Sequence, residues 1–125
     1  MKNKRHWAYT GGGVTLPMTV PAGTKSDDIV KFGAAGLYGV AETDRVTADQ
    51  ATKGTGPQGY VEGQSGVYFP GLVLTLRVAA TALNGIADFA PVDFDPVAKT
   101  YSTAATAAAG VGFRLNATTV GLRSN

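Results

Sequence analysis

Short apolar runs that alternate with polar residues and are cut by glycine and proline constrain this fold more than any other feature. In Val14–Val20 every second residue is apolar, and Pro21-Ala-Gly23 follows as a turn signal. A period of two places alternate side chains on one face of a β-strand. Pro17 cannot donate a backbone hydrogen bond, so we expect this strand to lie at the edge of a sheet.

The same pattern continues through the rest of the chain. The longest period-two run is Leu72–Ala79, and it predicts a central strand with Leu72, Leu74, Leu76 and Val78 facing the core. Asp95–Ala98 has proline at the second position of a four-residue turn, which predicts a hairpin. We expect further core positions at Val14, Leu16, Val20, Phe32, Val40 and Phe113.

Helix signals are weak. Ala79–Leu83 and Thr103–Ala109 could each form a turn or two of helix, and Asp49–Gly59 is polar and glycine-rich, which is typical of an exposed loop. The sequence therefore predicts an all-β fold, a small β-barrel or sandwich of short strands with at most one or two helical turns.

Composition indicates a protein that binds rather than reacts. The 125 residues fit one domain, and only 16% of them are charged, against about 25% in a typical globular protein. The absence of cysteine excludes disulfides and thiolate metal sites. We predict a single β domain over residues 14–125, preceded by an arm at residues 1–13.

The arm is basic and aromatic, and it ends in three glycines, Gly11–Gly13, which are typical of a flexible hinge. Its candidate contact residues are Lys2, Lys4, Arg5, Trp7 and Tyr9. Three interpretations stay open: a tail that orders against a protein surface, a disordered tail, or a nucleic-acid contact made by phosphate pairing and base stacking.

Reactive side chains are few. His6 is the only histidine, so neither a catalytic triad nor a multi-histidine metal site can form. Gly54–Gly59 matches G-x-G-x-x-G but has no strand before it and no helix after it, which favours a loop over a phosphate site. Asp88, Asp93 and Asp95 could hold a hard cation, although turn chemistry explains Asp95.

Other polar motifs also fit turns. Asp27 and Asp28 follow Ser26 in an expected turn, and Asn116-Ala-Thr118 matches a glycosylation sequon that we interpret as a hairpin turn. No run approaches the roughly 18 apolar residues of a membrane span. We therefore expect no enzyme activity, cofactor or metal, and no membrane association.

Several of these strand and turn patterns resemble one protein family. The segments that carry the resemblance are Val20–Gly23, Ser26–Val30, Gly36–Ala41, Gly59–Gly63, Pro91–Thr103 and Ala109–Phe113. In this order they are similar to the small capsid decoration, or cement, proteins of tailed phages. The resemblance covers roughly residues 14–115; Asp28 departs from it where a Gly-Asp pair is usual, and Leu72–Ile86 is longer and more apolar.

The resemblance implies a structural virion protein on the outer surface of a phage capsid, assembled in the host cytoplasm. Its expected partners are the major capsid protein and further copies of itself, in a homotrimer or alternatively a dimer, with no nucleic acid. The alternative function is a small β-barrel nucleic-acid-binding protein that uses the basic arm. A metal enzyme built on Asp88, Asp93 and Asp95 is a third possibility.

Overall fold

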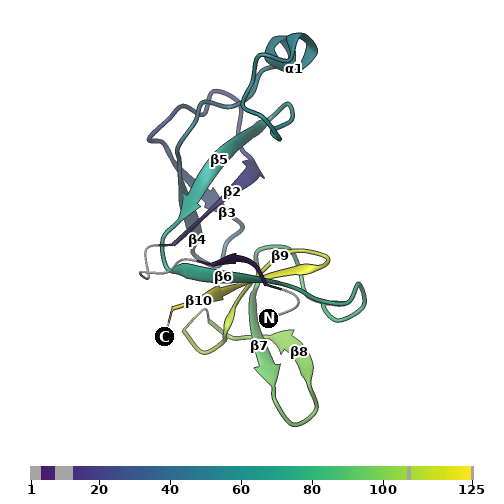
Figure 1. Ribbon diagram of the computed structural model, residues 1–125. Helices are drawn as coiled ribbons and strands as arrows, with labels where there is room; N and C mark the ends of the chain where they lie inside the picture. Colours follow the sequence, from purple (N-terminus) through teal and green to yellow (C-terminus); the bar gives the residue numbers. More distant parts are fainter. Residues whose placement is uncertain (1–3, 8–12, 107, 125) are drawn as a thin grey trace. The chain divides into compact units, whose positions relative to one another are not determined.

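The computed structural model describes residues 4–7, 13–106 and 108–124. It is all-β, as the sequence predicts, and its strands form two antiparallel sheets (Figure 1). The strands are β1 (Lys4–Trp7), β2 (Val14–Thr19), β3 (Ile29–Phe32), β4 (Leu37–Ala41), β5 (Gln64–Phe69), β6 (Leu72–Arg77), β7 (Pro91–Asp95), β8 (Thr100–Thr103), β9 (Gly112–Asn116) and β10 (Thr119–Arg123).

Both sheets are open. The six-stranded sheet has the order β1-β6-β10-β9-β7-β8, and the four-stranded sheet has the order β2-β5-β4-β3. Because the terminal strands of each order are not paired with one another, no closed barrel forms among the described residues. The all-β class is therefore confirmed, and the described residues do not adopt the closed-barrel form of the prediction.

The contacts divide the chain into two compact units, where the sequence analysis predicted one domain. One unit consists of the N-terminal strand, Lys31–Leu37 and the chain from Pro70 onward. The other consists of Thr15–Val30 and Tyr38–Phe69. The single domain over residues 14–125 stays a prediction.

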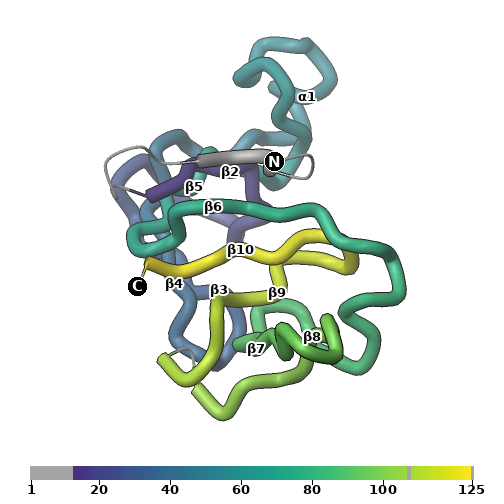
Figure 2. Tube along the Cα trace, turned by 60° about the horizontal axis from the view of Figure 1, so that its bottom comes forward, coloured from purple at the N-terminus to yellow at the C-terminus, as the bar shows by residue number. Residues whose placement is uncertain are grey.

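Proline and turn chemistry place the strands as the sequence indicates. Strand β2, which contains Pro17, lies at an edge of its sheet, and β6 lies inside its sheet between β1 and β10. Figure 2 shows β6 beside β10. Asp95 begins the turn between β7 and β8, and the amide of Lys99 donates to its carbonyl at 2.7 Å. Asn116 ends β9 and Thr119 begins β10, so this hairpin turns over two residues.

Most of the predicted core is buried. Val14, Leu16, Val20, Phe32 and Phe113 are all buried, whereas Val40 is half-buried. In the unit that contains the six-stranded sheet, one buried cluster consists of Leu83, Ile86, Val92 and Val120. Leu83 and Ile86 come from the segment after β6, so this irregular stretch contributes to the core although it forms neither helix nor strand.

The predicted inner face of β6 is wrong over half its length. Leu72 is buried, but Leu74 and Leu76 are only half-buried, and Thr75 is fully buried. The pairing with β10 explains the change, because the register shifts where Leu122 faces Leu74 and Arg123 faces Leu72. The extra residue, Val73, forms a β-bulge, and a bulge reverses which side of the sheet the following residues face.

The loop predicted at Asp49–Gly59 is also partly wrong, because α1 (Ala48–Lys53) is a helix. Thr47 and Gln50 form a reciprocal capping box, and Gly54 ends the helix with a left-handed φ of 67°. Lys53 and Asp49 are 3.2 Å apart as an i,i+4 ion pair. None of the helical residues is buried, so no apolar stripe could have indicated this helix.

Two leucines of β6 test the corrected face. Leu72→Ala should lower the free energy of unfolding by about 2–5 kcal/mol, because it empties a fully buried site. Leu74→Ala removes the same atoms from a half-buried position and should cost about 1 kcal/mol. Urea denaturation of both variants checks the difference, and equal midpoints would show that the register assigned to β6 is wrong.

Tyr101 predicts a pH dependence at alkaline pH. Its ring packs on Phe94, with 4.9 Å between centroids, and burial raises the pKa of Tyr101 above its usual value. Above about pH 10 the unfolded chain releases this proton while the folded protein keeps it, so stability should fall as pH rises. In urea denaturation at pH 8–11, the free energy of unfolding should fall less steeply with pH for Tyr101→Phe than for the wild type. Identical slopes of stability against pH for the two proteins would contradict this role of Tyr101.

Candidate interaction surface

The predicted contact residues of the arm are only partly described by the structure. Lys4, Arg5 and Trp7 lie in β1, which pairs antiparallel with β6. Lys2 and Tyr9 lie outside the described residues. Part of the predicted arm therefore belongs to the chain's own six-stranded sheet, and its role as a capsid contact stays a prediction.

The three carboxylates of the metal hypothesis are held in separate interactions. Asp88 pairs with Arg114, with 2.8 Å between Oδ1 and Nε. Oδ1 of Asp95 accepts from the amides of Val97 and Ala98 at 2.8 and 3.2 Å, which is the turn chemistry that the sequence predicts. Oδ1 of Asp93 accepts from the amide of Phe94. Within the described ranges no three acidic or histidine side chains gather in a possible metal site.

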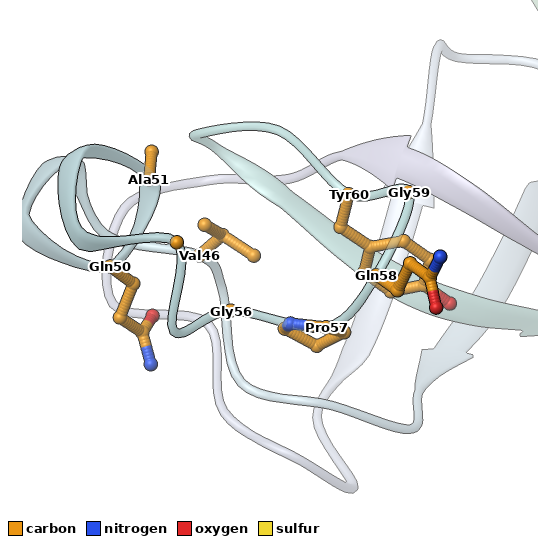
Figure 3. Close-up of a pocket in the computed structure, with 9 residues that line it drawn as sticks. Val46, Gln50, Ala51, Gly56, Pro57, Gln58, Gly59 and Tyr60 are labelled. Carbon is orange, nitrogen blue, oxygen red and sulfur yellow. The ribbon is translucent and has the colours of Figure 1, made fainter.

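The glycine-rich loop Gly54–Gly59 follows the C-terminus of α1. The carbonyl groups at that end carry the negative pole of a helix, so the loop lacks the amide-rich helix start that binds phosphate. A pocket of about 210 Å³ lies between α1 and this loop, and Figure 3 shows Val46, Gln50, Pro57 and Tyr60 among its lining residues. Its lining carries no carboxylate and no basic side chain, so it offers no acid–base pair.

The remaining polar motifs form turns, as expected. Oδ1 of Asn116 accepts from the amide and the hydroxyl of Thr118 at 3.0 and 3.3 Å. Oδ2 of Asp28 accepts from the amide of Lys25 at 2.9 Å, and Asp27 adopts a positive φ of 74°. These side chains shape the backbone and are exposed, which fits a structural role.

Three arginines that sequence reasoning did not select hold the irregular segments. Arg114 donates to the carbonyls of Leu83 and Ile86 as well as to Asp88. Arg123 donates to the carbonyls of Gly110, Ala108 and Ser124 at 2.9–3.0 Å. Arg45 donates to the carbonyl of Val20 at 3.1 Å. The five donors of a guanidinium allow one side chain to satisfy several loop carbonyls. The spacing of residues in the sequence gives no indication of these contacts.

Apolar side chains are exposed at turns and at a sheet edge. Val97 is 89% exposed in the β7–β8 turn, and Val61 is 62% exposed in the turn before β5. Ile29 is 68% exposed on β3, the terminal strand of the four-stranded sheet, and Tyr38 on β4 is 46% exposed.

Arg114 generates a prediction about the segment before β7. Arg114→Lys keeps a positive charge near Asp88 but cannot reach both carbonyls and the carboxylate with one ammonium group. Stability should fall by about 1–3 kcal/mol, the cost of leaving buried polar groups unpaired. Arg77→Lys, at an exposed position of β6, is the control and should stay within about 0.5 kcal/mol. Equal denaturation midpoints for the two variants would contradict the role of Arg114.

Comparison of the chain with models of protein families, with curated proteins and with solved structures found no match. Among the described residues, no helix has the length and apolar character needed to cross a bilayer.

Proposed function

We propose that this protein is a structural virion protein that decorates the outer surface of a phage capsid and cements neighbouring major capsid subunits. The resemblance of its strand and turn order to phage decoration proteins suggests this function. The observation that carries it furthest is the presence of exposed apolar side chains on turns whose backbone is fixed by hydrogen bonds.

Val97, in the unit of the six-stranded sheet, and Val61, in the other unit, are two such side chains. The amide of Val97 donates to Oδ1 of Asp95 at 2.8 Å, and the amide of Val61 donates to Oε1 of Gln64 at 3.1 Å. Each turn therefore presents its valine in a set conformation, so little conformational entropy is lost when a partner covers it. Turns of this kind suit a protein whose whole effect is binding energy.

The low charge of the chain supports the same function. With 16% charged residues and a net charge of +2, the protein has little electrostatic attraction for a highly charged partner. A cement protein needs only a modest free energy of association per copy, because many copies placed across subunit joints act together. Self-association as a homotrimer, or alternatively a dimer, would add contacts of the same kind.

Catalysis has less support. Asp88 is engaged in an ion pair with Arg114, Asp93 and Asp95 accept hydrogen bonds from nearby amides, and the pocket beside α1 has no acid–base pair. We therefore propose a non-enzymatic role that requires no cofactor.

The decisive experiment is heat release of DNA from heads that lack the protein and from heads to which it has been added back. Undecorated heads should assemble but release DNA at a lower temperature, and added protein should restore the release temperature of decorated heads. The Val97→Asp and Val61→Asp variants should fold normally but raise the DNA-release temperature less than the wild-type protein does, because a buried charge opposes binding. Thr52→Asp on exposed α1 is the matched control and should restore as wild type does.

Identical release curves for decorated and undecorated heads would contradict the cement function. Binding of the purified protein to duplex DNA, weakening with salt by a slope near 0.9 per phosphate contacted, would instead favour the nucleic-acid alternative.

A further inference from the structure

Strand β1 lies at one end of the six-stranded sheet, and β6 is its neighbour there. Three Cα pairs define the register, with Lys4 opposite Leu76, His6 opposite Thr75 and Trp7 opposite Leu74. The strand comes first in the chain, and β6 begins only at Leu72. This pairing joins segments that are far apart in sequence.

Strand β1 covers an edge of β6 that would otherwise be unpaired. Thr75 is fully buried, and its Oγ1 has no hydrogen-bond partner among the described residues. Leu74 and Leu76 are half-buried. Without a paired strand this edge would present unpaired amides and carbonyls between apolar side chains, which is the type of edge that recruits strands from other chains.

The sheet accepts one strand at this edge and then ends. The register of β1 against β6 shifts between Lys4 and His6, which places a bulge beside Arg5. Bulges and basic residues on an edge strand both oppose the addition of a further strand. Pairing at β6 is therefore limited to one incoming segment and does not lead to open-ended growth.

The connection from β1 to β2 permits the strand to come from another copy. Residues 8–13 form a six-residue link that contains three glycines. From Trp7 to Val14 such a link reaches at most roughly 25 Å when fully extended. If the β6 edge of a second copy lies within that distance, it could pair with the β1 strand of the first copy, and the link would need no extra residues.

We propose that the β6 edge of one copy binds the Lys4–Trp7 strand of a second copy, so that neighbouring molecules exchange β1. The exchanged pair has the same register and the same backbone hydrogen bonds as the pair within one chain. The balance between the two forms is then set by the link and by the local concentration of copies. The inference goes beyond the proposed function, since it requires no capsid.

Introduced cysteines test the exchange directly, because the chain has no cysteine of its own. Directly opposed residues of an antiparallel pair have Cα separations that a disulfide can bridge. The Lys4→Cys and Leu76→Cys single variants, mixed as full-length chains, can form their mixed disulfide only between two molecules. Thr119→Cys mixed with Arg77→Cys is the matched control, because these residues oppose each other between β10 and β6, away from the exchanged strand.

After oxidation, the mixed Lys4–Leu76 dimer should exceed the control dimer at least about tenfold, as identified by mass. The double variant, Lys4→Cys with Leu76→Cys, should form a disulfide within one chain near 1 µM and increasingly between chains toward about 1 mM. A disulfide confined to single chains at every concentration, or none at all, would overturn the exchange.

Trp7→Cys with Leu74→Cys repeats the experiment at a second opposed pair, in case either first variant fails to fold. Failure to bind capsids would not affect this result, and absence of exchange would leave capsid cementing open. The strand-exchange proposal and the capsid-cementing proposal are therefore tested independently.

Discussion

The fold depends on how a chain of short strands satisfies the backbone polar groups of the long segments between them. A buried carbonyl without a partner costs about 1–3 kcal/mol, and irregular segments have no ladder to supply partners. Arg114 and Arg123 supply donors from adjacent hairpin strands, β9 and β10, to segments that precede those strands. Through Arg114, the stretch around Leu83 and Ile86 can place apolar side chains in the core without forming regular structure.

Elements defined by backbone chemistry could be predicted from the sequence. Pro17 predicted an edge strand because it lacks a donor, and Asp95–Ala98 predicted a hairpin because proline and an aspartate fix that turn. The face of β6 could not be predicted, because the bulge at Val73 depends on the register of β10, which is about 50 residues away in sequence. Helix α1 was missed because its signal is a capping box, not a periodic stripe.

The same division applies to the candidate site. Turn roles for Asp95 and Asn116 followed from local spacing and are confirmed by their hydrogen bonds. The ion pair of Asp88 with Arg114 joins residues that are 26 positions apart, so only tertiary structure could show it. The arm was recognised by its composition, but composition did not indicate that Lys4–Trp7 matches an edge of the chain's own sheet.

Thr75 connects these observations to function. Its pairing with Gly121 on β10 places a hydroxyl in a buried position where a valine of similar size would leave no polar group unpaired. The unpaired hydroxyl of Thr75 therefore lowers the free energy of unfolding at β6, the strand that pairs with β1. A valine in place of Thr75 would stabilise a permanent β1–β6 pair. The lower stability that Thr75 causes instead eases release of β1 by local unfolding. Exchange of strands between copies requires such release, so local unfolding of β1 would be the step that allows neighbouring molecules to join.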